Sequence, residues 1–118
     1  MNELKEILNK CQQTVNFLDE KIQDINQRGK GCGDTALHLV CHWGDIEAAK
    51  ILLEAGANVN EVGDLGMTPI FSAIMSDNPE LVLLLINSGA NIDHVNEMGR
   101  TPRQFALNLN AVNVMPLF

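Results

Sequence analysis

Three histidines and three cysteines are the side chains best suited to chemistry in this chain, because imidazoles and thiolates bind metals and take part in catalysis. His38 and His42 are four residues apart, so they share one face of a helix, and Cys41 is adjacent in sequence. On such a helix Cys41 points about a quarter turn away from His42, so three ligands converge poorly. We therefore predict no metal site and expect Cys41 to pack in the core as a small hydrophobic residue.

The sequence also contains no recognisable catalytic motif. The chain has no Tyr, no phosphate-binding loop and no nucleophile elbow. Cys32 could be paired with His38 or His42 as nucleophile and base, but nothing specific supports the pair, and a partly exposed turn thiol explains Cys32 equally well. We predict that the chain is not an enzyme and has no catalytic residue and no cofactor.

Charge is distributed unevenly along the chain. The net charge is −7, and residues 51–99 contain no Lys or Arg. The acidic residues of that span are Glu54, Glu61, Asp64, Asp77, Glu80, Asp93 and Glu97. Such a field repels phosphate backbones and anionic lipid surfaces and attracts basic proteins. We expect a basic protein as the partner, with no nucleic acid and no membrane.

Length and composition suit one small domain of 118 residues, 46% of them hydrophobic. The N-terminal sequence MNELKEILNK mixes charges of both signs and lacks the apolar region of a signal peptide. The longest apolar run, residues 81–86, is too short to span a membrane. The cysteines are odd in number and follow no disulfide framework, which predicts a reduced, cytoplasmic protein.

The candidate residues lie in a sequence that repeats every 33 residues. Gly33, Gly66 and Gly99 are 33 residues apart, and each is followed two residues later by a Thr. The sequence LLEAGAN of residues 52–58 returns as LINSGAN in residues 85–91. A fixed period of this length is the signature of a stacked repeat architecture.

Each repeat carries signals for two helices. Thr35 is a natural N-cap for a helix over residues 36–43, which Gly44 ends. Asp45 can cap a second helix, which Gly56 ends. The second repeat copies this order, with Thr68 and Pro69 expected to cap and start its first helix.

Two local irregularities are also expected. Pro116 falls where a helix interior should be, so the last helix is predicted to be short or distorted. The stretch that leads to Gly33 is one residue longer than the one that leads to Gly66, which predicts a bulge.

Residues 1–27 show a different pattern. Their apolar residues are spaced alternately four and three apart, as on one face of a helix. These residues are Leu4, Leu8, Cys11, Val15, Leu18, Ile22 and Ile25. The stripe fits one long helix over the end of the stack, two short helices broken near residues 12–14, or a coiled-coil dimerisation segment. Capping is the preferred role, because a stack of repeats needs its terminal apolar face covered.

These residues resemble the ankyrin repeat. The family pattern has a Gly before Thr-Pro-Leu-His-x-Ala, a Gly between two antiparallel helices, and then Leu-Leu-x-x-Gly-Ala-x-x-Asn. The chain has TALH in residues 35–38, Gly44, and LLEAGANVN in residues 52–60, and the match covers residues 33 to about 109. The departures are Ala36 in place of Pro, Val40 in place of Ala, and Phe71 and Gln104 in place of the motif His.

The resemblance implies an all-α solenoid of stacked helix-turn-helix units with β-turn loops and a helical N-terminal cap. Residues 1–32 would be the cap or a degenerate first repeat, residues 33–65 and 66–98 ankyrin repeats, and residues 99–118 a truncated C-terminal repeat. The motif His is implied to be structural, bonding backbone near the turns. Function in the family is almost always recognition of another protein.

The ankyrin pattern places certain side chains on a concave face formed by the turns and the first helix of each repeat. We expect the partner-binding residues to be Asp34, His42, Trp43, Glu61, Asp64, Leu65, Met67, Met75, Glu97, Met98 and Arg100. Several are large and apolar, and an apolar strip with an acidic rim is typical of a protein-binding surface. The alternative is that Met67 and Met75 pack between repeats and that Trp43 lies over its own turn.

These features predict a non-catalytic interaction module that binds a basic partner through its concave face. A stand-alone acidic ankyrin protein of this size resembles the bacterial immunity proteins that neutralise a cognate toxin, and toxins acting on nucleic acid are commonly basic. We therefore expect an immunity protein that is monomeric when free. The alternative is an intracellular ankyrin-repeat scaffold or regulatory subunit.

Overall fold

The computed structural model describes every residue except Met1 and Asp19, and of Asn2 it describes the backbone alone. The helices are α1 (Asn2–Gln12), α2 (Ala36–His42), α3 (Ile46–Glu54), α4 (Pro69–Met75), α5 (Pro79–Asn87) and α6 (Pro102–Leu109). Single 3₁₀ turns lie at η1 (Val15–Phe17), η2 (Asp64–Gly66) and η3 (Met115–Leu117). The described residues include no strand, so the fold is all-α, as predicted.

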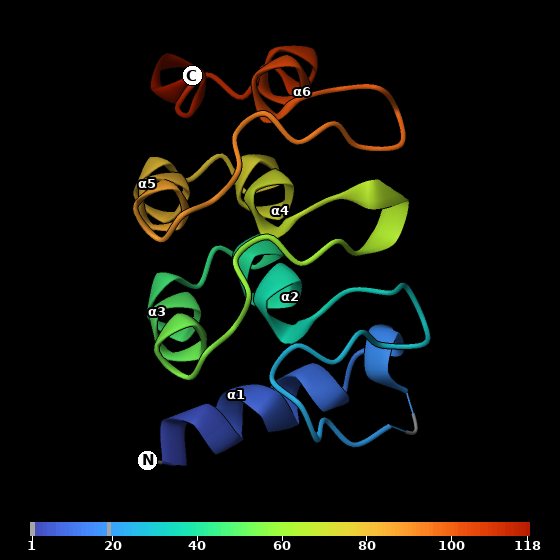
Figure 1. Ribbon diagram of the computed structural model, residues 1–118. Helices are drawn as coiled ribbons and strands as arrows, with labels where there is room; N and C mark the ends of the chain where they lie inside the picture. The colour runs from blue at the N-terminus through green and yellow to red at the C-terminus, as the bar shows by residue number, and fades with distance from the viewer. Residues whose placement is uncertain (1, 19) are drawn as a thin grey trace.

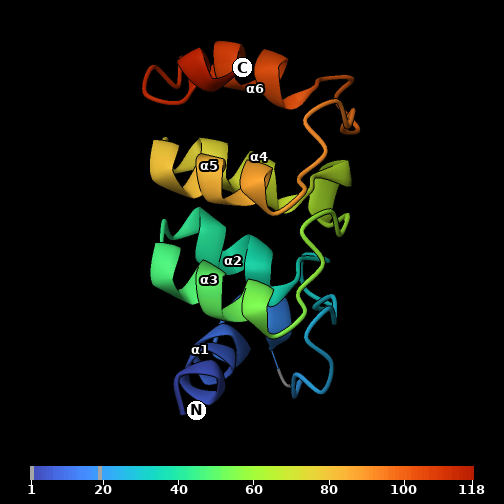
Figure 2. The same cartoon turned by 60° about the vertical axis from the view of Figure 1, so that its left-hand side comes forward.

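The helices are stacked in pairs along the long axis of the molecule (Figure 1). α2, α4 and α6 form one layer, and α3 and α5 form the other (Figure 2). The turns project from the side of the first layer, and α1 lies across the N-terminal end (Figure 1). Within the described part of the chain, no helix has the length and apolar character needed to cross a membrane.

Most helices begin at a side chain that caps them. The Thr35 side chain accepts a hydrogen bond from the backbone N–H of His38, and the His38 ring accepts one from the Thr35 N–H, which makes a capping box. Asp45 caps α3 by accepting from the N–H of Ala48 at 3.1 Å. Each such cap is worth about 1 kcal/mol, because it satisfies backbone N–H groups that have no partner within the helix.

Thr68 departs from the predicted capping. It occupies the N-cap position of α4, but its side chain makes no capping bond, and its buried Oγ1 has no hydrogen-bond partner among the described residues. The backbone N–H of Phe71, from which that capping bond would come, donates instead to the Thr68 carbonyl at 3.1 Å. The Phe71 ring also supplies no acceptor for the Thr68 N–H, whereas His38 and Gln104 supply one in the neighbouring repeats. Pro69 at the first turn, with its φ already suited to a helix, starts α4 without that bond.

The first helix of each repeat ends at a left-handed residue. Gly44, Asp77 and Asn110 occupy equivalent positions 33 residues apart and have φ values of 72°, 50° and 55°. Gly adopts this conformation without a steric penalty, and Asn and Asp tolerate it better than other residues. The turn that follows α2, α4 and α6 therefore has a left-handed residue at the same position in each case, although the residue type changes.

The N-terminal segment is not one long helix. α1 ends at Gln12, and Thr14 Oγ1 donates to the carbonyl of Cys11 at 2.6 Å. A single 3₁₀ turn follows, in which Phe17 is buried, whereas Val15 is 74% exposed. Of the three interpretations of residues 1–27, two short helices broken near residues 12–14 agrees best with the structure, although the second helix is reduced to a single 3₁₀ turn. A helix of 11 residues is also too short to support a coiled coil.

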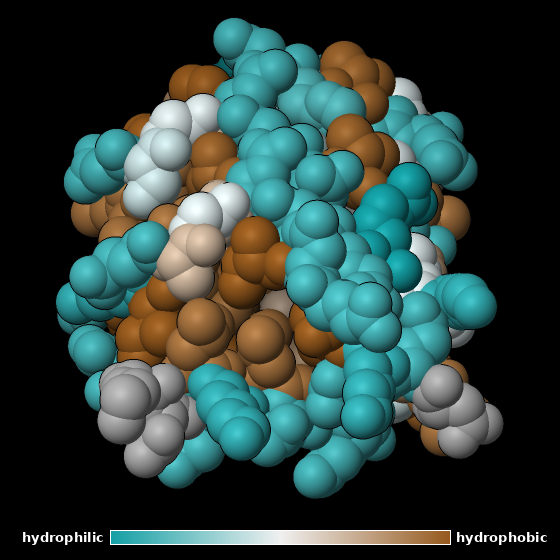
Figure 3. All heavy atoms as spheres, turned by 60° about the horizontal axis from the view of Figure 1, so that its bottom comes forward, coloured by the Kyte–Doolittle hydropathy of each residue, from teal (hydrophilic) through white to brown (hydrophobic). Residues whose placement is uncertain are grey.

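Partly buried residues of this segment pack against the core and cover its N-terminal end. They are Leu4, Ile7, Leu8, Ile22 and Ile25. Figure 3 looks toward this end of the molecule and shows hydrophobic side chains ringed by hydrophilic ones. The apolar stripe predicted for residues 1–27 is thus divided, because its members before residue 12 share a helix face and its later members reach the core from irregular backbone.

The bulge expected before Gly33 is present. The N–H of Gly29 donates to the carbonyl of Asp34 across the first turn, whereas Gly63 pairs with Met67 and Asn96 with Arg100 in the next two turns. The first turn therefore holds one extra residue. It lies against the N-terminal segment so closely that a Cβ on Gly29 would collide with the Asn16 carbonyl. Only glycine fits there.

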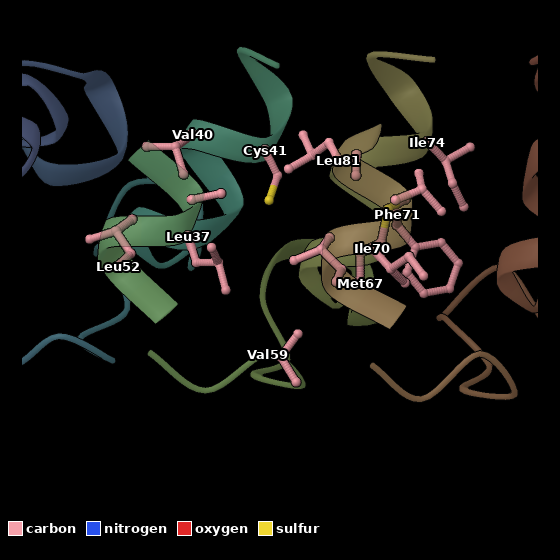
Figure 4. Packing of buried hydrophobic residues seen from close by; sticks show 14 of the residues in the cluster. Leu37, Val40, Cys41, Leu52, Val59, Met67, Ile70, Phe71, Ile74 and Leu81 are labelled. Carbon is pink, nitrogen blue, oxygen red and sulfur yellow. The ribbon is translucent and has the colours of Figure 1, made fainter. Parts of the chain in front are cut away.

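The hydrophobic core lies between the two layers and between successive repeats. Leu37, Val40 and Cys41 of α2 and Ile70 and Ile74 of α4 lie within it (Figure 4). Each fully buried Leu or Ile side chain contributes about 1.5–3 kcal/mol to stability. Cys41 is fully buried, as predicted, and burial raises the pKa of its thiol well above the ordinary value.

The end of the chain is distorted, as Pro116 predicted. No second α-helix follows α6, and the single 3₁₀ turn η3 replaces it. Asp77 holds this segment by accepting from the N–H groups of Asn113 and Val114 at 3.1 and 3.2 Å. The left-handed Asp77 therefore joins the second repeat to the C-terminal segment.

Candidate functional site

The concave face consists of the three projecting turns, residues 29–34, 63–67 and 96–100, and the sides of α2, α4 and α6 that adjoin them (Figure 1). The turns are joined to one another. Asp34 Oδ1 accepts from the N–H of Asp64 at 2.9 Å, and the carbonyl of Leu65 accepts from the N–H of Glu97 at 3.0 Å. These bonds fix the spacing of the turns, so the face is a preformed surface.

A hollow of about 210 Å³ lies on this face between the second turn and α4. It is lined by Asp34, Asp64, Leu65, Met67, Ser72 and Met75. Five of these six residues belong to the predicted partner-binding set, so the structure brings them together from two turns and one helix. The hollow combines apolar walls with two carboxylates.

The two methionines behave differently. Met67 is only 8% exposed and belongs to the core, so its packing between repeats is the better explanation, and it reaches the face only where it lines the hollow. Its carbonyl accepts from the His38 Nε2–H at 2.9 Å, which holds the residue inward. Met75, at the end of α4, is 42% exposed and is available to a partner.

Leu65 is the tip of the second turn and has φ of 57°. A bulky side chain is rarely found in this left-handed region, and such strain is often retained at functional positions. The side chain is exposed in spite of its apolar character. Neither burial nor local geometry therefore explains a Leu at this position.

Trp43 does not stand free on the concave face. Lys10 Nζ of α1 lies 4.6 Å from the centre of its ring, within the range of a cation–π contact. Trp43 is also absent from the lining of the hollow. His42, beside it, is exposed. The structure thus places these two residues at the N-terminal end of the face, apart from the second turn.

The other predicted residues do not line the hollow. Glu97 and Met98 are exposed on the third turn, and Arg100 there is half-buried. Asn96 organises this turn, because its Oδ1 accepts from the N–H groups of Met98 and Arg100. Glu61 is half-buried and accepts from Asn58 Nδ2 at 3.3 Å.

His38 is occupied by structural bonds on both ring nitrogens. Nδ1 accepts from the Thr35 N–H at 3.1 Å, and Nε2 donates to the Met67 carbonyl, which fixes the neutral tautomer with the proton on Nε2. Burial lowers the pKa of the ring, although Asp34 and Glu61 nearby oppose this. Among the described residues no group of three or more His, Cys, Asp or Glu side chains could hold a metal ion.

Asn16 performs the same task for the N-terminal segment. It is buried, and its Nδ2 donates to the carbonyl of Asp34 at 2.7 Å. Asp34 occupies the position in the first turn that Met67 occupies in the second. The Oδ1 of Asn16 accepts from the N–H groups of Cys32 and Asp34. Nothing in the repeat pattern pointed to Asn16, because no Thr-x-x-His motif accompanies it.

Ser72 was also missed, although a signal exists in the sequence. Its equivalents in the other repeats are Leu39 and Phe105. A small polar residue in place of a large apolar one removes side-chain volume next to the second turn. Comparing the three repeats position by position would have marked this site.

Residues 5–96 match the family model for ankyrin repeats in three copies. The chain is similar to BCL-6 corepressor-like protein 1 of Homo sapiens, with 40% identity over 67 residues, or 57% of this chain and 4% of that protein. It is 43% identical over 54 residues to Neurogenic locus notch homolog protein 4 of Homo sapiens, or 46% of this chain and 3% of that protein.

A third relative is Rabankyrin-5 of Homo sapiens, 46% identical over 52 residues, which are 44% of this chain and 4% of that protein. The chain therefore spans only a few per cent of the length of these relatives. The family model, by contrast, matches more than half of the chain and begins within α1. This chain belongs to the ankyrin-repeat family, whose repeats typically serve as non-catalytic protein-interaction modules.

Proposed function

We propose that the chain binds a basic segment of another protein through its concave face. The observation that carries this proposal is the hollow beside the second turn, where exposed Leu65 and Met75 lie next to the carboxylates of Asp34 and Asp64. Apolar anchors near acidic groups on a preformed surface supply both contact area and orientation for a partner.

The charges on this face support a basic partner. In the described part of the chain the one ion pair is Lys50–Glu47 on α3, so no acid of the concave face is held in an ion pair with a lysine or arginine. Acidic groups that are free of ion pairs attract a positively charged protein and raise the rate at which it associates. Binding of this kind weakens as salt increases, because exposed charges are screened.

The biological role, the oligomeric state and the compartment are more specific proposals. A role in neutralising a bacterial toxin is favoured only by size and net charge, and the relatives named above are eukaryotic proteins, none of which is named as an immunity protein. A scaffold or regulatory subunit fits the repeats equally well. For either, we propose a monomer when free and a reducing compartment such as the cytoplasm, which the free cysteines support.

Affinity capture with two matched variants tests the proposal. Met75 on α4 and Leu83 on α5 are 42% and 43% exposed, and they lie in the same repeat but in different helix layers. Met75→Lys introduces a positive charge into the concave face, and Leu83→Lys introduces the same charge into the other layer. Each bait would be compared with the unaltered chain, with the captured proteins quantified by mass spectrometry.

We expect Met75→Lys to lose a protein that both the unaltered chain and Leu83→Lys retain. Circular dichroism would check that both variants keep their helical content. Loss with Leu83→Lys and retention with Met75→Lys would place the binding surface on the other layer and refute the proposal. If the captured protein proved acidic, the charge argument would fail even if the face were correct.

A further inference from the structure

We propose that the hollow beside the second turn receives an arginine side chain of the partner. This inference rests on the proposed function and specifies the chemical group that the face recognises. Three properties of the hollow lead to this proposal. They are the gap beside the small side chain of Ser72, the hydrogen-bond acceptors that have no partner in the described part of the chain, and the apolar side chains between those acceptors.

The gap arises from a single residue type. Leu39 and Phe105 occupy the positions equivalent to Ser72 in the neighbouring repeats, and both have much larger side chains. In the second repeat the small side chain leaves part of the hollow of about 210 Å³ beside α4. A folded core normally leaves few voids, so an open space produced by one departure from the repeat invites a group from outside.

Ser72 supplies a polar group inside the hollow. The residue is 5% exposed and lines the hollow, and its hydroxyl, which makes no hydrogen bond to the other described residues, is not sealed from solvent. Such a hydroxyl in a helix commonly bonds to a carbonyl four residues earlier. A donor that enters the hollow can therefore bond to this hydroxyl in place of water, without breaking a hydrogen bond within the described part of the chain.

The carboxylates at the rim have acceptor capacity to spare. Asp34 accepts from the N–H of Asp64 through Oδ1, which leaves Oδ2 without a bond in the described part of the chain. Asp64 is exposed and its carboxylate forms no ion pair with a described residue. Arg28, just before the first turn, forms no ion pair with either carboxylate, and its Nε donates to the Gly33 carbonyl at 2.8 Å.

The number and placement of acceptors favour arginine over lysine. Two carboxylates and one hydroxyl surround a single hollow, and a guanidinium offers five N–H donors in a planar fork that can reach several acceptors together. Leu65, Met67 and Met75 supply apolar contacts for the methylene stem. Methionine also adapts its shape to flat groups, which suits the face of a guanidinium.

A small probe tests the hollow without knowledge of the partner. The ε-methyl groups of methionine would be labelled with ¹³C, and Nα-acetyl-arginine-N-methylamide would be titrated while methyl shifts are followed by NMR. Met67 and Met75 line the hollow, whereas Met115 lies in η3 at the C-terminal end and serves as an internal control. We expect saturable shifts of the first two methyl groups and an unchanged signal from Met115.

The corresponding citrulline amide is the matched control probe, because it keeps the stem and replaces the cation by a neutral urea. We expect it to bind more weakly, by up to about fivefold for each carboxylate that loses its cationic partner, because about 1 kcal/mol is the upper value for one exposed ion pair. The lysine amide should also bind more weakly. Equal binding of the citrulline amide would overturn the role of the carboxylates, and equal binding of the lysine amide would overturn the choice of arginine.

Variants of the chain locate the site. Asp64→Asn removes one rim charge, and Asp93→Asn makes the same change at an exposed residue outside the hollow. Ser72→Leu restores the residue type of the first repeat and should close the hollow. We expect Asp64→Asn and Ser72→Leu to weaken the arginine probe, and Asp93→Asn to leave it unchanged. If Ser72→Leu does not fold, Asp64→Asn and the citrulline probe still decide the question.

The outcomes separate this inference from the proposed function. Saturable binding of the arginine probe without any protein captured by the concave face would support the hollow and reject the function. Capture that depends on Met75 but not on Asp64 or Ser72, together with no response to the probe, would support the function and reject the hollow.

Discussion

Replacing His38 tests how the repeats are coupled. The His38 ring joins the start of α2 to the second turn by accepting from the Thr35 N–H and donating to the Met67 carbonyl at 2.9 Å. His38→Gln is the mildest change, because Gln104 forms the same capping box in the third repeat, where its Oε1 accepts from the Thr101 N–H at 2.9 Å.

The loss of folding stability expected for each variant follows from the hydrogen bonds that it loses. His38→Gln keeps the capping box and loses the bridge to Met67, whose carbonyl still accepts from the Gly63 N–H. The expected cost is about 1 kcal/mol, as for one net hydrogen bond. His38→Phe copies Phe71 of the second repeat but also leaves the buried Thr35 N–H without an acceptor, so the expected cost is about 2–4 kcal/mol.

Stability should also depend on pH through His38. Burial lowers the pKa of the ring in the folded state below its ordinary value of 6.5, so the unfolded chain takes up a proton there more readily. The stabilisation by neutral His38 is therefore complete above pH 6.5 and is lost as pH falls below it, by up to about 1.4 kcal/mol per pH unit. The loss stops when the folded-state pKa is reached.

The assay is urea unfolding of the unaltered chain and His38→Gln at several pH values between 8 and 5. The difference between the two cancels the carboxylates that both chains share. We expect the unaltered chain to be more stable at pH 8 and its advantage to shrink as pH falls below 6.5. An advantage that stays constant, or grows, toward pH 5 would refute the assignment of His38 as a buried neutral bridge.

Three further predictions concern other parts of the stack. Asp77→Gly should speed amide hydrogen exchange at Asn113 and Val114 and lower stability by about 1–2 kcal/mol, because the lost hydrogen bonds outweigh the relief of a left-handed Asp; unchanged exchange would contradict this. Leu65→Gly should raise stability by about 0.5–1 kcal/mol in urea unfolding by relieving its positive φ while weakening partner capture, and a loss of stability would show that its side chain packs. A colorimetric thiol reagent should modify only exposed Cys32 in the folded chain and two more thiols after unfolding. Burial raises the pKa of Cys11 to about 11 and that of Cys41 further, so neither thiol is a reactive thiolate in the folded state. Fast reaction of three thiols in the folded chain would contradict the burial of Cys11 and Cys41.

Much of the concave face could be predicted from sequence because repeat position largely determines which way a side chain points. The resemblance to the ankyrin repeat places Leu65, Met75 and Asp64 on one surface, and the structure brings them to one hollow. Their role in binding remains a prediction. Met67 is more buried than expected because the residue before each Thr varies in exposure, and here the bond from His38 to its carbonyl holds it inward.

The sequence by itself determined the helix starts, the left-handed turns and the 33-residue register. Caps, prolines and glycines act within a few residues, so their effects are encoded locally. Only the tertiary structure decided where α1 ends, that Lys10 lies over Trp43, and that Ser72 lines a hollow together with residues of two turns. Each of these depends on contacts between residues far apart in the chain, where the space left by neighbouring side chains, not local preference, fixes the result.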